Sequence, residues 1–227
     1  MLFSTAIIST AAFGLAAATP IITQRAGGGG PSVVAGKGFF LAVQGDLREM
    51  DPENAANNAW VLSLQRVATG FYASVIEPRD RDKTKNPTFY INGTTADQQT
   101  LNLDVPGAFP LSAVVGSSED VADGENVVSF RNNAATKGLT ASKRAADGIP
   151  ILNGPSSGGG WAVCRRDLPT NTGPVSVMMP RFVKAGESAP EGCVTVDFVL
   201  LCKDLAELQP TDGWNHDNVS EISCVAN

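Results

Sequence analysis

The chain contains one histidine, His216, and four cysteines, all in its last third. No two cysteines have C-x-x-C spacing and His216 has no second histidine, so the pattern argues against a zinc site. No serine lies in a Gly-x-Ser-x-Gly elbow that would pair with His216 as a general base. We therefore expect no metal, no cofactor and no catalytic residue, and we expect His216 to be a surface side chain.

Basic runs and aromatic residues are also scarce. The formal net charge is −6, and the basic residues form nothing longer than the pairs Lys143-Arg144 and Arg165-Arg166. An acidic chain without a basic patch is not expected to bind nucleic acid or an anionic membrane surface. Aromatic residues make up only 7% of the chain, so most are needed in the core. Trp214, in a polar segment, is the best candidate for an exposed aromatic ring.

Residues 1–18 predict a secretory signal peptide. An apolar stretch from Leu2 to Leu15 is followed by small residues, with Ala16 and Ala18 at the −3 and −1 positions of a cleavage site. The stretch is shorter than the roughly 20 apolar residues that a bilayer span requires. We expect processing after Ala18, a mature chain that begins at Thr19, and an extracellular location.

The rest of the chain predicts one domain with a leader and a tail. Residues 19–31 include four consecutive glycines, which is typical of a flexible leader. Residues 32–208 form the expected β-rich domain, and residues 209–227 form a polar C-terminal tail. No later apolar stretch is long enough to span a membrane or to serve as a lipid-anchor signal.

Short apolar runs rich in β-branched and aromatic residues, separated by Gly, Pro, Asn and Asp, predict an all-β fold. We expect an antiparallel β-sandwich, with a β-trefoil or another barrel-like arrangement as the alternative. Two segments, 51–60 and 203–208, are candidates for one or two helical turns, and no internal repeat is apparent. The expected strands are Gly38–Gln44, Trp60–Val67, Phe71–Glu77, Thr88–Ile91, Thr100–Val105, Leu111–Val115, Asn126–Arg131, Trp161–Arg166, Val175–Phe182 and Cys193–Cys202.

An even number of cysteines in an exported chain indicates two disulfides, for which three connectivities exist. We predict Cys164–Cys193, which joins the ends of neighbouring strands, and Cys202–Cys224, which ties the tail to the last strand. In the segment 193–202 the even-numbered residues form one apolar face that includes Cys202. The other face turns apolar only at Val199 and Leu201, so we expect a core strand that is covered on both sides at its far end.

Modification signals fit an exported chain. Asn92-Gly-Thr94 and Asn218-Val-Ser220 are N-glycosylation sequons, expected on surface loops. Lys143-Arg144 resembles a dibasic processing site within the loop-like stretch 132–148, although an uncut loop is the more ordinary reading.

A polysaccharide hydrolase is the enzymatic alternative, because glycoside hydrolysis needs only two facing carboxylates that leave no local motif. Asp197 is the unusual acid, since it lies in the middle of a strand, and its candidate partners are Glu77, Glu119 and Glu125. We expect Asp197 instead to lie on a partly covered sheet face and to be hydrogen-bonded there. A lectin-like module, which needs exposed aromatic rings, is a further alternative.

Four short motifs, Phe39-Phe-Leu-Ala-Val43, Gly138-Leu139, Gly160-Trp-Ala-Val-Cys164 and Pro190-Glu-Gly-Cys-Val-Thr-Val196, carry a family resemblance. Over about residues 38–203 the chain resembles small secreted proteins of filamentous fungi that form a family of unknown function. It is also distantly similar to secreted cell-wall-associated proteins. The resemblance implies a non-enzymatic extracellular β-rich protein, wall-associated or effector-like, whose partner is a cell-wall glycan or an extracellular protein.

Overall fold

The computed structural model describes residues 31–54, 59–80, 82, 85–105, 109–116, 126–155, 157–170 and 173–227. The predicted signal peptide and most of the leader lie outside these residues. A short 3-10 helix covers Pro52–Asn54. The strands in the described part are β1 (Val33–Gly36), β2 (Gly38–Gln44), β3 (Trp60–Ala68), β4 (Phe71–Pro78), β5 (Phe89–Asn92), β6 (Thr100–Val105), β7 (Phe109–Gly116), β8 (Val127–Arg131), β9 (Thr140–Lys143), β10 (Pro150–Asn153), β11 (Gly160–Thr170), β12 (Gly173–Val183), β13 (Cys193–Cys202) and β14 (Ile222–Val225).

Six strands close into a ring. β2 pairs with β5 and β5 with β6, while β9 pairs with β10, β10 with β13, and β13 with β2. The gap between β6 and β9 is bridged by the backbone N–H groups of Gly138 and Leu139, which both donate to the carbonyl of Gln99. The ring is therefore a small barrel, closed by strand pairing except between β6 and β9, where these two hydrogen bonds cross the gap.

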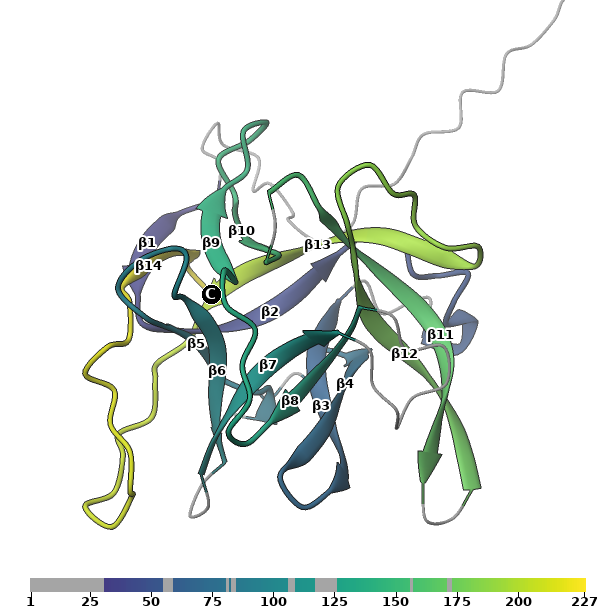
Figure 1. Ribbon diagram of the computed structural model, residues 1–227. Coiled ribbons are helices and arrows are strands. Elements are labelled where there is room, and N and C mark those ends of the chain that lie inside the picture. The colour runs from purple at the N-terminus through teal and green to yellow at the C-terminus, as the bar shows by residue number, and fades with distance from the viewer. Residues whose placement is uncertain are drawn as a thin grey trace, which may run out of the picture.

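Three hairpins, β3–β4, β7–β8 and β11–β12, close one end of this barrel and lie below it in Figure 1. They contact one another through the pairs β4–β8, β8–β12 and β12–β4, which form a triangle. Each of the units β2–β5, β6–β9 and β10–β13 thus gives its outer strands to the barrel and its inner hairpin to the cap. This confirms an all-β fold and, of the arrangements left open by the sequence, it matches the β-trefoil rather than two stacked sheets.

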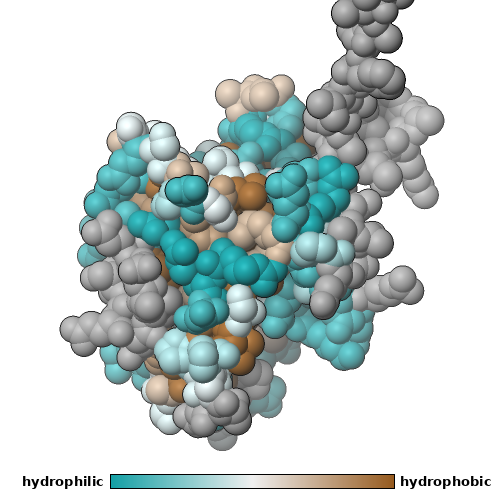
Figure 2. Space-filling view, turned by 90° about the vertical axis from the view of Figure 1, so that its right-hand side faces the viewer, coloured by the Kyte–Doolittle hydropathy of each residue, from teal (hydrophilic) through white to brown (hydrophobic). Residues whose placement is uncertain are grey.

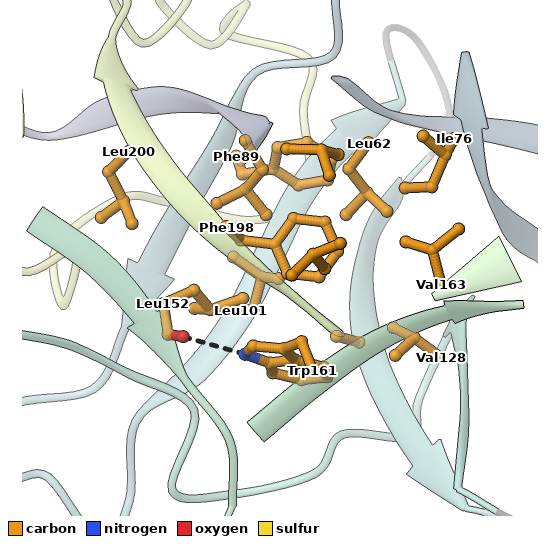
Figure 3. Close-up of a cluster of buried hydrophobic side chains, with 14 of the residues drawn as sticks. Leu62, Ile76, Phe89, Leu101, Val128, Leu152, Trp161, Val163, Phe198 and Leu200 are labelled. Carbon is orange, nitrogen blue, oxygen red and sulfur yellow. Dashed lines mark hydrogen bonds between the residues drawn. The ribbon is translucent and has the colours of Figure 1, made fainter. Parts of the chain in front are cut away.

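The main core lies inside the barrel and under the cap, and every unit contributes to it. Figure 3 shows Phe198 of β13 facing Leu62 and Phe89 of the first unit and Leu101 of the second. Trp161 packs edge-on against Phe198, with ring centroids 5.6 Å apart, and its indole N–H donates to the Leu152 carbonyl at 2.9 Å. The burial of large side chains from all three units makes the core a shared one.

Strand β13 is covered on both sides, as the alternation predicts. Val196, Phe198 and Leu200 lie in the main core. On the opposite face, Val199 packs with Leu201 and with the residues Ile149, Ile151 and Val225 in a second cluster.

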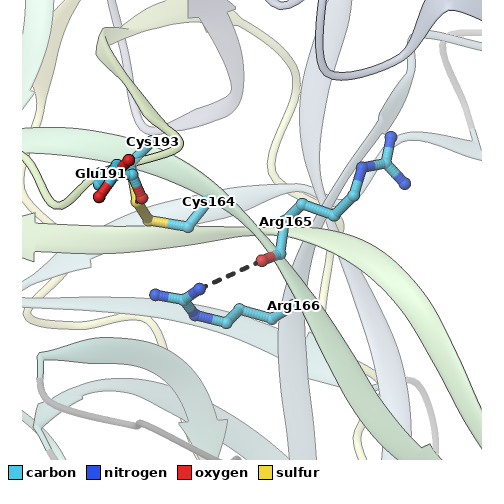
Figure 4. Close-up of a disulfide and its surroundings, with 5 residues drawn as sticks. All are labelled: Cys164, Arg165, Arg166, Glu191 and Cys193. Atoms are coloured by element: carbon cyan, nitrogen blue, oxygen red, sulfur yellow. Dashed lines mark hydrogen bonds between the residues drawn. A yellow bond between two sulfur atoms is a disulfide. The ribbon is translucent and has the colours of Figure 1, made fainter.

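Both predicted disulfides are confirmed, and they start from the two ends of β13. Cys164–Cys193 joins directly opposite residues of β11 and β13 (Figure 4). Cys202–Cys224 joins β13 to β14. The second bridge ties the C-terminal tail to the barrel. Strand β14 of the tail is also held there by parallel pairing with β13 and antiparallel pairing with β1.

Four strands were not expected from the sequence, namely β1, β9, β10 and β14. The stretch 132–148 therefore contains a strand rather than only a loop. The expected helical turn at 203–208 is absent from the structure, which has irregular backbone there. Residues 203–221, called the strap from here on, run along the outside of the barrel beside β5 and β6 (Figure 1).

Gly159 and Gly160 give a matched pair for testing the packing of the third unit. A Cβ atom at Gly159 would lie 2.2 Å from the Phe182 ring and 2.8 Å from the Val183 carbonyl oxygen, whereas one at Gly160 would meet nothing within 4 Å. We expect Gly159→Ala to lower the free energy of unfolding by about 2 kcal/mol through overpacking. Gly160→Ala should leave it nearly unchanged. Denaturant unfolding of the two variants measures this, and equal stabilities would contradict the packing described.

Candidate functional site

One group of largely shielded polar side chains surrounds Asp104, near the end of β6. One carboxylate oxygen, Oδ1, accepts hydrogen bonds from the Tyr90 hydroxyl at 2.9 Å and from the Trp214 indole N–H at 3.1 Å. The other, Oδ2, lies 2.8 Å from Nε2 of His216. Tyr90, Asp104, Trp214 and His216 are called the Asp104 cluster below. It joins two barrel strands, β5 and β6, to the strap.

The cluster is largely shielded from solvent. The side chains of His216 and Asp104 are 18% and 13% exposed, and Tyr90 is buried. The His216 ring meets the Tyr90 ring edge-on, with centroids 5.0 Å apart. Because a carboxylate only accepts hydrogen bonds, Nε2 of His216 carries the hydrogen in this contact. All three donors are thereby satisfied by one acid, which makes the cluster an anchor for the strap.

Two expectations about this region are wrong. His216 was expected on the surface, and Trp214 was expected to be the exposed aromatic, but both are partly buried against the barrel. The reason is that the strap returns along β5 and β6 after leaving β13. The acid that receives them, Asp104, was not expected to be a site residue. It lies more than a hundred positions away in the sequence, and no local motif links the three residues.

The burial of Tyr90 raises the pKa of its hydroxyl, and the neighbouring Asp104 charge and the hydrogen bond to Asp104 raise it further. The neutral phenol is thus the form that the folded protein favours.

A second polar group holds the turn between β9 and β10. Nη1 of Arg144 donates to Asp197 Oδ2 at 2.6 Å and to Gln44 Oε1 at 2.8 Å. Its Nε and Nη2 donate to the carboxylate of Asp147. The bonds to Asp147 are the main cause of a raised Arg144 pKa and a lowered Asp147 pKa. Asp197 is 39% exposed at its side chain, so its expected place on a partly covered, hydrogen-bonded sheet face is confirmed.

These contacts bear on two sequence hypotheses. In the dibasic pair, Lys143 is the exposed last residue of β9, opposite Pro150, and Arg144 begins the β9–β10 turn, where Asp147 and Asp197 bind its side chain. For the hydrolase alternative, Asp197 is engaged with Arg144, and Glu77 lies on β4, which does not pair with β13. Glu119 and Glu125 lie outside the described residues. The structure therefore brings no two of the proposed acids together in its described part.

The two sequons come side by side. Asn92 at the end of β5 is bridged to Val219 of the strap. The Gly93 N–H donates to the Asn218 carbonyl at 2.9 Å, and the Ser220 N–H donates to the Ile91 carbonyl at 2.9 Å. Ser220 Oγ also donates to the Gly93 carbonyl at 2.6 Å.

An apolar cavity lies where the barrel meets the cap, with lining residues from all three units, among them Leu62, Ala113, Trp161 and Phe198. Its lining has no polar surface with which a ligand could form a hydrogen bond, so it is a packing gap of the shared core. Within the described residues, no group of three or more His, Cys, Asp or Glu side chains is placed to hold a metal ion. In the same residues, no helix is both long and apolar enough to cross a membrane.

Comparison with known protein families places the chain in one of them. The family model described as a domain of unknown function, DUF7907, covers residues 36–202. The chain belongs to this family. No curated protein and no solved structure matches it. The DUF7907 match runs from the end of β1 to the end of β13, so it contains the three units of the trefoil. The strap and β14 lie outside it, and with them lie Trp214, His216 and Asn218.

The anchoring role of Asp104 is testable with two substitutions. Asp104→Ala leaves three donors without their acceptor, and we expect it to lower the free energy of unfolding by about 2 kcal/mol. Asp104→Asn should cost much less, because its amide oxygen still accepts from Tyr90 and Trp214, while its NH₂ can donate to the other tautomer of His216. Denaturant unfolding and limited proteolysis of the strap are the measurements. Asp217→Ala, an exposed strap position, is the control, and a loss equal to that of Asp104→Ala would contradict the anchor.

The Tyr90 hydroxyl should make stability depend on alkaline pH. The pKa of this hydroxyl is higher in the folded chain than in the unfolded chain. The stability that the group contributes is therefore fully present below the unfolded-state pKa of about 10 and is lost as the pH rises above that pKa. The free energy of unfolding should therefore fall above pH ~10 by up to about 1.4 kcal/mol per pH unit from this group. Tyr90→Phe removes the titrating group and should give a shallower slope from pH 8.5 to 11. Identical slopes would show that Tyr90 does not titrate as described.

Proposed function

We propose that this protein is secreted and has a binding or structural role outside the cell, at a cell wall, rather than an enzymatic one. The observation that carries the proposal is the way in which two partly or largely covered acids, Asp104 and Asp197, are bonded within the protein. The Asp104 carboxylate accepts hydrogen bonds from Tyr90, Trp214 and His216. The Asp197 carboxylate is paired with Arg144. A catalytic acid must be able to contact the substrate. The carboxylates of Asp104 and Asp197 instead hold parts of the protein, namely the strap and the β9–β10 turn.

Several features support the extracellular part of the proposal. Two disulfides connect the last third of the fold, and such bonds persist in oxidising compartments. The sequence of residues 1–18 predicts a signal peptide, and two sequons are present.

A neutral polysaccharide of the wall is the partner class that we favour. The net charge of −6 would repel an acidic polymer. Figure 2 shows the face on the β11–β12 side, where hydrophilic residues run across the middle between separate apolar areas. A surface of this kind suits a hydroxyl-rich ligand better than a large apolar one.

The test uses the full chain, expressed in a eukaryotic secretion host and purified from the medium. We expect the mature N-terminus at Thr19, co-sedimentation with insoluble chitin, β-glucan or cellulose, and no release of reducing sugar. Binding should change little with salt, because it does not depend on charge. Asp197→Asn should bind as the natural protein does.

Each contrary result has a distinct meaning. Intact Met1 in the medium contradicts the signal peptide. Release of reducing ends that Asp197→Asn abolishes supports the hydrolase instead. Failure to bind any of the three polysaccharides contradicts the wall partner and favours an extracellular protein as the partner.

A further inference from the structure

We infer that Asn92 and Asn218 form one N-glycosylated edge of the molecule, and that the glycans on it protect the strap from proteases. The inference rests on the proposed secretion, because N-glycans are added only along the export route. The two acceptors are far apart in the sequence, but the fold joins them: Asn92 closes β5, and Asn218 lies in the strap segment that is hydrogen-bonded to it.

Both amide side chains are available for attachment. Asn218 is exposed and Asn92 is partly exposed, and neither side chain makes a hydrogen bond to another described residue. By contrast, Asn86 and Asn102 are buried, and Asn102 forms side-chain hydrogen bonds with Thr100 and Ser112. A bulky, solvated glycan at Asn92 or Asn218 would therefore break no contact of the fold.

The hydroxyl groups of the two sequons, on Thr94 and Ser220, differ in their contacts, and the difference bears on when each asparagine is glycosylated. Thr94 is exposed, whereas Ser220 Oγ donates to the Gly93 carbonyl at 2.6 Å and accepts from Gln99 Nε2 at 3.3 Å. The hydroxyl is part of what defines the acceptor tripeptide. Asn218 must therefore be glycosylated before the strap packs against β5. Once the strap is packed, the Ser220 hydroxyl is bonded to Gly93 and Gln99 and helps to hold it there.

The strap is the part of the described chain that such glycans would protect. Its backbone bonds to the barrel lie at its ends, where Lys203 donates to Gly38 and residues 218–220 bond to β5 and Gly93. Between these ends it is held by the side chains of Trp214 and His216, and many of its residues are exposed. Exposed backbone with few hydrogen bonds is where proteases cut. Asn218 follows this stretch directly, and Asn92 lies beside it.

The experiment compares the secreted protein with Asn92→Gln, Asn218→Gln and the double variant. Glycopeptide mass spectrometry should find a glycan at each asparagine, and each substitution should remove one. Thr94→Ala should remove the Asn92 glycan without loss of a described hydrogen bond, and Ser220→Thr should keep the Asn218 glycan. A secreted protein that begins at Thr19 but has no glycan at one or both positions overturns the inference while the proposed secretion stands. Intact Met1 contradicts both.

Protection is measured separately, by limited proteolysis with mapping of the cut sites. We expect the double variant to be cut within the strap several-fold faster than the glycosylated protein, with no difference elsewhere in the chain. Unfolding curves of the two proteins show whether lost stability accounts for the change. Equal cleavage rates overturn the protective role.

Discussion

The fold depends on one strand that has neighbours on both edges and apolar contacts on both faces. β13 pairs with β2 along six residues, which closes the barrel, and it also pairs with β10, β11 and β14. Its side chains enter the main core on one face and a second cluster on the other. Removal of β13 would open the barrel, and it would take one pairing partner from the cap hairpin β11–β12 and one from β14. The strand is the last of the trefoil, so the barrel closes only when the third unit is in place.

Strands with large apolar side chains are recognised well from the sequence. The expected bounds of β2, β6 and β13 agree with the structure, because runs such as Gly38–Gln44 carry an apolar signal strong enough to stand alone. β9, with residues Thr-Ala-Ser-Lys, has almost no such signal and is half exposed. It is a strand because β10 lies beside it. Short strands of this type form because a neighbouring strand pairs with them, and the sequence of the short segment alone does not encode that pairing.

The threefold arrangement was hidden for a similar reason. The three units fill the shared core with different side chains: β3 of the first unit and β11 of the third contribute Trp60 and Trp161, whereas β7 of the second contributes Leu111 and Ala113. A shared core requires only that the summed volume fill the space, so the units can diverge without losing the fold. The Asp104 cluster could not be foreseen either, because its two halves meet only when the strap has docked. The disulfides were easier to predict, since four cysteines allow few pairings and strand order removes most of them.

The placement of the cysteines also has a consequence for oxidative folding. Cys193 and Cys202 are the first and last residues of β13. An extended strand rises about 3.3 Å per residue, so its two ends are held roughly 30 Å apart. A disulfide needs Cα atoms within about 7 Å, and a bond between Cys193 and Cys202 is therefore impossible once β13 has formed. The strand acts as a spacer that removes one wrong isomer, and its register with β11 sets Cys164 opposite Cys193. Cys224 is then left as the partner for Cys202, so the correct bonds follow from strand pairing that precedes oxidation.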